Sequence, residues 1–193
     1  DSVGVETRTE DGEEQNYIVG HASIFNELSQ DLGGFREKIS PTAFDSVLKD
    51  DCRCLINHDP NLIIGRTIAG TMNLAVDKRG LRYEVKIPDT TYGKDLLVSM
   101  KRRDITQSSF GFIVEDDTWT EDRSEGGMVR TINKVGRLLD TSVVTYPAYL
   151  GADVSVAQRS LSLYKEKQEI MKEEQDLHKR SLLKLKIKIL KKR

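Results

Sequence analysis

The stretch Thr106-Gln107-Ser108-Ser109-Phe110-Gly111-Phe112 places two hydroxyls directly before an aromatic–glycine–aromatic run. Phe110 and Phe112 fall on one face of an expected β-strand, and Ser109 and Gly111 fall on the other, because side chains alternate with a period of two. A glycine beside a hydroxyl leaves room for another backbone to lie close to it. On its own the pattern favours an ordinary sheet segment, because such runs are common in β proteins, but it also suits a nucleophilic serine that reaches an extended peptide.

Length and composition indicate one soluble domain with additional polar chain. The 193 residues are 37% hydrophobic and 32% charged. The net charge of −1 is unevenly spread: residues 165–193 carry +6 and the remainder carries −7. An acidic domain with a basic tail suggests different partners for the two parts. No run is apolar enough to cross a bilayer and no secretory signal opens the chain, so we expect no membrane partner.

Working outward from the opening stretch, the pattern predicts many short strands and a few helices. Residues 1–16 fit a flexible start or an edge strand, residues 116–127 an exposed loop, and residues 181–193 alternate like a strand although a preceding helix could continue through them. Strands are expected over 17–25, 35–39, 51–58, 62–68, 70–76, 81–87, 106–114, 128–135 and 137–149, a hairpin turn at 77–80, and helices over 40–48, 90–103 and 160–179.

These elements predict an α+β fold with a mostly antiparallel, β-barrel-like core flanked by helices. We expect a flexible N-terminal segment (1–16), a main domain (17–155) and a helical, basic C-terminal tail (156–193).

His58 is the favoured candidate for a general base. It ends an alternating strand at a turn, where its side chain can face a cleft, and the pKa of imidazole lies near neutral pH. His21 stands in mid-strand and His178 in the polar tail. A lone histidine is also commonly structural.

Such a base needs a third group that orients the imidazole. Asp59 is adjacent to His58, but neighbouring side chains on a strand point to opposite faces. Asp140 interrupts an apolar strand, where a carboxylate is either partly buried with a partner or aimed into solvent.

Other chemistries fit less well. On a strand, Cys52, Cys54 and His58 share one face, but three ligands without a fourth make a weak zinc site, and a cysteine nucleophile would lack an orienting group. A disulfide between residues two apart would be strained, so reduced thiols are expected. No phosphate-binding glycine loop is present. We therefore expect no cofactor and no metal.

Five motifs, in order, resemble the prohead maturation proteases of tailed bacteriophages, over roughly residues 17–150. They are Gly20-His21-Ala22-Ser23-Ile24-Phe25, Ser40-Pro41-Thr42-Ala43-Phe44, Asn57-His58-Asp59, Ser108-Ser109-Phe110-Gly111-Phe112, and residues 140–149 from Asp140-Thr141-Ser142-Val143-Val144 to Tyr149. The tail after about residue 155 carries no motif of this family.

The resemblance implies a serine endopeptidase with a fold like herpesvirus assemblin. It implies His58 as the base, Ser109 as the nucleophile and Asp140 as the third member of the triad. Ser108 stands beside Ser109, but on a strand the two point to opposite faces, so only one can meet His58. The turn from Tyr146 to Gly151 is a candidate for the oxyanion-binding backbone.

The resemblance also implies substrates and a location. These are the scaffolding protein or the scaffolding segment of the major capsid protein, together with the protease itself, inside the viral prohead in the host cytoplasm. The basic tail would be a targeting or self-cleaved segment. One alternative is a non-catalytic capsid-assembly scaffold protein of the same fold. Another is a nucleic-acid-binding domain that uses the basic tail, although we expect no nucleic-acid partner.

Overall fold

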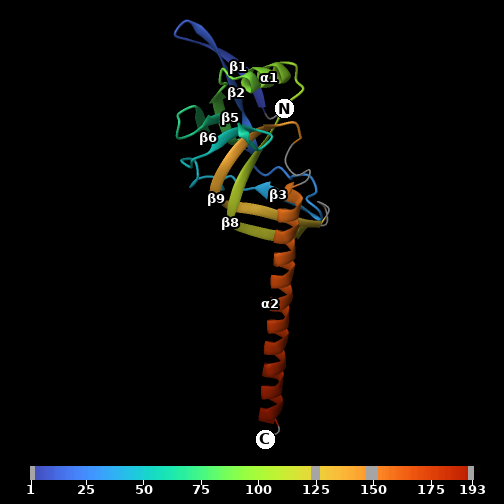
Figure 1. Cartoon of the computed structure of the whole chain (residues 1–193). Coiled ribbons are helices and arrows are strands. Elements are labelled where there is room, and N and C mark those ends of the chain that lie inside the picture. Colours follow the sequence, from blue (N-terminus) through green and yellow to red (C-terminus); the bar gives the residue numbers. More distant parts are fainter. Residues whose placement is uncertain (1–2, 123–126, 147–151, 191–193) are drawn as a thin grey trace.

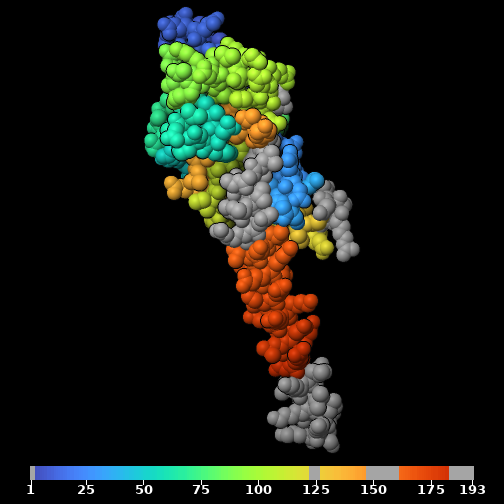
Figure 2. Space-filling model, turned by 45° about the vertical axis from the view of Figure 1, so that its right-hand side comes forward, coloured from blue at the N-terminus to red at the C-terminus, as the bar shows by residue number. Residues whose placement is uncertain are grey.

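The computed structural model describes residues 3–122, 127–146 and 152–190, with side chains described for 3–121, 127–146 and 161–182. Two β-sheets form the body of the molecule, and one long helix, α2 (Ala152–Leu190), leads the chain away from them (Figure 1). In the space-filling view the coloured part of α2 extends away from the body (Figure 2).

The first sheet is antiparallel throughout, in the order β1-β2-β7-β6. Its strands are β1 (Val3–Glu10), β2 (Glu13–Ile24), β7 (Gly80–Lys86) and β6 (Met72–Val76). A β-bulge interrupts the pairing of β2 with β7 between His21 and Ser23. The β1–β2 hairpin makes β1 the edge strand, which is one of the two possibilities expected for the first residues.

The second sheet is organised around one long strand, β9 (Gly127–Val144). β8 (Gln107–Asp122) runs antiparallel along β9. On the other side of β9, β3 (Phe35–Ile39) and β4 (Arg53–Ile56) pair with it in parallel, and β5 (Asp59–Arg66) continues the sheet beyond β4. The C-terminal half of β9 is therefore held between β4 and β8, and this position brings distant segments together.

Apolar side chains of both sheets form the main core. Ile18 and Tyr83 from the first sheet and Leu138 and Val143 from the second are fully buried. Helix α1 (Thr91–Lys101) buries Leu96 and Met100. Burial of each such side chain stabilises the fold by about 1.5–3 kcal/mol, so the core fixes the strands that carry the site.

Local sequence signals identified several elements correctly. Thr90 caps α1 by accepting a hydrogen bond from the Gly93 N–H at 3.1 Å, as a threonine before a helix predicts. The hairpin between β6 and β7 turns at Asp77, whose side chain accepts hydrogen bonds from the N–H groups of Arg79 and Gly80.

The helix predicted for residues 40–48 was wrong. The segment forms successive turns closed by i→i+3 hydrogen bonds, such as Val47 N–H to Phe44 C=O at 3.1 Å. Its apolar side chains are still buried, with Ala43 and Phe44 fully enclosed. The apolar pattern correctly indicated a buried face, but a turn with i→i+3 bonds gives the same spacing over so short a segment.

The exposed loop predicted for residues 116–127 was also wrong, because β8 continues to Asp122. Its charges have partners across the strand pair: Asp117 binds Arg130 at 2.6 Å and Glu115 binds Lys134 at 2.6 Å. Trp119 packs against Phe35, with ring centroids 4.8 Å apart. Residues 123–126 lie outside the described residues.

The predicted fold class is confirmed as α+β with mostly antiparallel strands, but the described sheets do not close into a barrel. Residues 160–179 are helical as predicted, and α2 continues through Leu190, so the strand-like alternation after residue 181 does not produce a strand. Within the described residues, no helix is long and apolar enough to span a membrane.

Candidate active site

His58 lies in a two-residue turn between β4 and β5. The closing pair is Ile56 and Asp59, and the turn residues Asn57 and His58 have φ angles of +51° and +58°. Positive φ at both central residues is the signature of a type I′ hairpin, in which asparagine is favoured. The prediction that His58 continues the strand face of Cys52 and Cys54 was therefore wrong, because the strand ends at Ile56.

The turn is tied to the end of β9. The Asn57 N–H donates to the Val143 C=O at 2.9 Å, and the Asn57 side-chain oxygen accepts from the Thr145 N–H at 2.9 Å. These bonds hold a strained turn against the strand that carries Asp140.

His58 and Asp140 form a close pair, with Nδ1 and Oδ1 2.6 Å apart. The residues are separated by 82 positions in the chain and meet because β4 and β9 are parallel neighbours. Asp59 instead accepts a hydrogen bond from the Asn61 N–H. A carboxylate at Nδ1 favours the tautomer with its proton on that nitrogen, which leaves the lone pair on Nε2.

Ser109 shares the face of β8 and β9 that carries Asp140. In the ladder Ser109 is opposite Ser142, and Gly111 is opposite Asp140. Directly opposed residues in an antiparallel pair have neighbouring side chains on one face. Because the Ser142 Oγ is 3.2 Å from His58 Nδ1, Ser109 and the His58–Asp140 pair both border Ser142.

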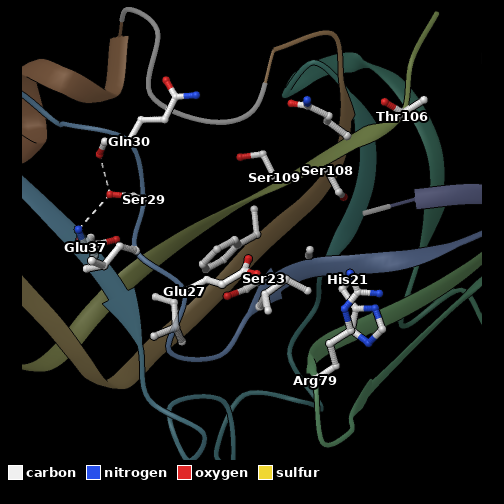
Figure 3. Close-up of a pocket in the computed structure, with 16 residues that line it drawn as sticks. His21, Ser23, Glu27, Ser29, Gln30, Glu37, Arg79, Thr106, Ser108 and Ser109 are labelled. Atoms are coloured by element: carbon white, nitrogen blue, oxygen red, sulfur yellow. Dashed lines mark hydrogen bonds between the residues drawn. The ribbon is translucent and has the colours of Figure 1, made fainter. Parts of the chain in front are cut away.

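Ser108 points to the other face, as the two-residue period predicts. Its hydroxyl lies 2.8 Å from the buried Tyr83 hydroxyl and donates to the Ser142 C=O at 3.0 Å. Figure 3 shows the side chains of Ser108 and Ser109 leaving β8 in different directions. The geometry thus distinguishes the two serines: the Ser108 hydroxyl is engaged by Tyr83 and the Ser142 C=O, whereas Ser109 lies on the face that carries Asp140.

Ser109 is buried, with 2% of the residue exposed. Its hydroxyl has no hydrogen-bond partner among the described residues. The hydrogen bond from Ser109 to His58 is therefore not formed in this structure. Bonds of this kind are often absent without substrate and tighten when substrate binds.

Ser109 also lines a pocket of about 490 Å³ between the start of β8 and β2 (Figure 3). Glu27, Ser29 and Gln30 line another part of it. The volume falls within the usual range of about 300–1,000 Å³ for binding sites. Ser109 is thus the residue shared by the pocket and the face that carries Asp140.

His21 belongs to the same pocket but has a different partner. Its Nε2 is 2.8 Å from an Asp77 carboxylate oxygen, and Figure 3 shows it beside Arg79. The pKa of Asp77 is lowered: burial raises it, but the hydrogen bonds from His21 and the turn N–H groups outweigh that effect. This histidine–carboxylate pair reinforces the β6–β7 turn.

The two cysteines are buried and free. Burial raises the pKa of the Cys52 thiol to about 12 and raises that of Cys54 further. Both thiols are therefore protonated near neutral pH, and neither is a reactive nucleophile. Across the described ranges no three histidine, cysteine or carboxylate side chains gather as a metal site would require.

Sequence reasoning did not single out Asn57 and Ser142 as contributors to this site. Asn57 could have been found from the preference of type I′ turns for asparagine. Ser142 could have been found because it stands two residues after Asp140 and so shares its strand face. The proposed oxyanion segment, residues 146–151, lies largely outside the described residues.

Gly111 gives a direct test of this geometry. A Cβ at Gly111 would lie 2.3 Å from Asp140 Oδ2, so the carboxylate occupies the space that a side chain would fill. We expect Gly111→Ala to displace the Asp140 carboxylate and to lower peptidase kcat/KM by about 100-fold, as small misplacements of catalytic groups do. Steady-state kinetics on a peptide substrate measures this.

Gly4→Ala is the matched control, because Gly4 is also a strand glycine and its added Cβ would meet nothing within 4 Å. This variant should keep wild-type activity. Equal activity in the two variants would show that the Asp140 carboxylate need not lie over Gly111.

The family match comes from comparison with known proteins. The sequence profile described as Caudovirus prohead serine protease matches residues 4–187 of the 193. The chain belongs to this family. Prohead serine proteases are bacteriophage peptidases of capsid maturation, so the predictions of family, serine peptidase activity and viral role are confirmed. The match extends beyond the expected 17–150 at both ends and includes most of α2. No curated protein and no solved structure shows significant similarity to this prohead protease.

Proposed function

We propose that this prohead protease is an endopeptidase in which Ser109 is the nucleophile, His58 the general base and Asp140 the residue that orients the base. The observation that carries the proposal is the 2.6 Å contact between His58 and Asp140, beside the strand face on which Ser109 lies. In a serine triad the carboxylate accepts a hydrogen bond from His Nδ1–H, which leaves Nε2 to accept the proton of the serine hydroxyl.

The mechanism follows from these positions. Asp140 keeps the proton on His58 Nδ1, so Nε2 accepts the proton of the Ser109 hydroxyl as Oγ attacks the scissile carbonyl. The protonated imidazole then donates that proton to the leaving amine. Water hydrolyses the acyl-enzyme with His58 as base, which regenerates the serine. Substrate must first bring the Ser109 hydroxyl within reach of Nε2.

The surroundings of Ser109 favour an extended peptide as substrate. Among the described strands, β8 pairs only with β9, so the other edge of its first residues borders the pocket. An extended peptide can add to such an edge by main-chain hydrogen bonds. This arrangement supports cleavage in unfolded or loosely folded segments of a protein.

The substrates we propose are the scaffolding protein, or the scaffolding segment of the major capsid protein, and the protease itself. Membership of the prohead protease family supports these partners, and it supports action inside the prohead in the host cytoplasm. We further propose that the basic end of the chain is a targeting or self-cleaved segment. Deleting residues 180–193 should then reduce packaging of the protease into proheads.

The test combines labelling and cleavage. Purified chain is incubated with a serine-directed phosphonate, and separately with the scaffolding and major capsid proteins of the same bacteriophage. We expect one phosphonate adduct, on the peptide that contains Ser109, and new N-termini in the scaffolding segment. Ser109→Ala should show neither. Unchanged substrates and no adduct would favour a non-catalytic scaffold protein of this family.

A further inference from the structure

Ser142 occupies the centre of the site without belonging to the triad. It follows Asp140 by two residues on β9, so both side chains lie on one face of the strand. Its backbone is opposite Leu55 of β4 on one side and Ser109 of β8 on the other. The side chain is fully buried.

The Ser142 hydroxyl contacts both members of the His58–Asp140 pair. It donates to Asp140 Oδ1 at 2.7 Å and accepts from the His58 backbone N–H at 3.2 Å. A serine hydroxyl has one donor and two acceptor positions, so it can make both bonds at once. Asp140 Oδ1 then receives two donors, the Ser142 hydroxyl and His58 Nδ1–H.

These bonds fix two separate degrees of freedom. The bond to Asp140 Oδ1 holds the carboxylate in the rotamer that meets His58. The bond from the His58 N–H holds a backbone whose φ of +58° is unfavourable for a residue other than glycine. One hydroxyl therefore positions the imidazole and its carboxylate relative to each other.

The fold itself does not require a hydroxyl at this position. The strand pairings of residue 142 with Leu55 and Ser109 are made by the backbone, and a small apolar side chain would fill the buried space. A buried hydroxyl contributes little net stability when it is bonded, and it is costly when it is not. Its presence is better explained by the two groups that it contacts.

We propose that Ser142 is a positioning residue of this protease, which holds the Asp140 carboxylate against His58 and so keeps His58 in the Nδ1–H tautomer. The inference rests on the proposed roles of His58, Ser109 and Asp140. It predicts that removing the hydroxyl slows catalysis and loosens the imidazole while the fold remains.

The test uses the full-length chain with three substitutions. Ser142→Ala should lower kcat/KM by about 10-fold or more, because a displaced base is poorly aligned for proton transfer. Ser142→Cys keeps the volume of the side chain but offers only a weak donor, so it should lose a comparable factor. Ser142→Thr keeps the hydroxyl and should restore most of the kcat/KM that Ser142→Ala loses.

A second measurement does not depend on proteolysis. Ring ¹⁵N chemical shifts of His58 report its neutral tautomer, and Ser109→Ala as the background prevents self-cleavage. We expect the Nδ1–H form to predominate with Ser142 present. The fraction of the Nε2–H form should rise in Ser142→Ala and Ser142→Cys and fall back in Ser142→Thr.

Ser108→Ala is the matched control, because Ser108 is a serine of the neighbouring strand whose hydroxyl also makes two hydrogen-bond contacts, on the opposite face. It should change neither kcat/KM nor the tautomer by more than about twofold. Thermal unfolding identifies any variant that fails to fold. A Ser142→Cys variant with wild-type kcat/KM and an unchanged tautomer would overturn the inference. If the wild-type chain cleaves nothing, the proposed function fails, and the tautomer still tests the role of Ser142.

Discussion

Replacement of Ser109 by alanine is expected to abolish cleavage, with kcat/KM reduced by at least about 10⁴-fold. The hydroxyl is the only group on that side chain that can form an acyl-enzyme, and no neighbouring thiol replaces it, because Cys52 and Cys54 are buried and protonated. Cleavage of a fluorogenic peptide, followed over hours, measures the residual rate.

The fold should not change in this variant. The Ser109 hydroxyl makes no hydrogen bond within the described residues, so its loss leaves no buried partner unsatisfied. Ser108→Ala is the control on the same strand and should keep kcat/KM within about twofold of wild type. Equal loss of activity in both variants would reassign the nucleophile.

Replacement of Asp140 by asparagine is expected to lower kcat by about 10³- to 10⁴-fold, a steep loss but smaller than that for Ser109. The amide has nearly the same shape as the carboxylate but can present an N–H to His58 Nδ1. The imidazole would then carry its proton on Nε2, where it cannot accept the proton of Ser109. The charge that stabilises the imidazolium is also removed.

This effect depends on the tautomer, so it can be separated from a simple loss of structure. The ring ¹⁵N shifts of His58 in Asp140→Asn should change toward the Nε2–H form while far-UV circular dichroism stays the same. Asp59→Asn is the control, because Asp59 is adjacent to His58 in sequence but contacts Asn61. Near-normal turnover of Asp140→Asn would remove Asp140 from the site.

The elements predicted correctly from sequence were those with a local chemical signal. A threonine cap defined the start of α1, and an aspartate–glycine turn defined the β6–β7 hairpin. Residues 40–48 and 116–122 were predicted wrongly. Over 40–48 a turn with i→i+3 bonds gives the same apolar spacing as a short helix. Over 116–122 the strand depends on distant partners, such as Arg130, whose cation pairs with Asp117.

The site was predictable in its residue types but not in its geometry. His58 and Asp140 meet only because β4 and β9 pair in parallel, and such a long-range pairing leaves no trace in the local pattern. The sequence therefore indicated which side chains could act together, with the help of the family resemblance. The prediction did not include Ser142, although its position two residues after Asp140 on one strand places both side chains on the same face.

The hairpin that carries His58 also determines where this protein tolerates added length. A two-residue type I′ turn fixes the register of both strands. One residue inserted at Asn57-His58 would therefore turn the imidazole away from Asp140. The β1–β2 hairpin has an equally short turn, Asp11-Gly12, at the far end of the first sheet (Figure 1), where no side chain of the site lies. Affinity tags and fluorescent labels for tracking the enzyme during capsid assembly therefore belong at that tip.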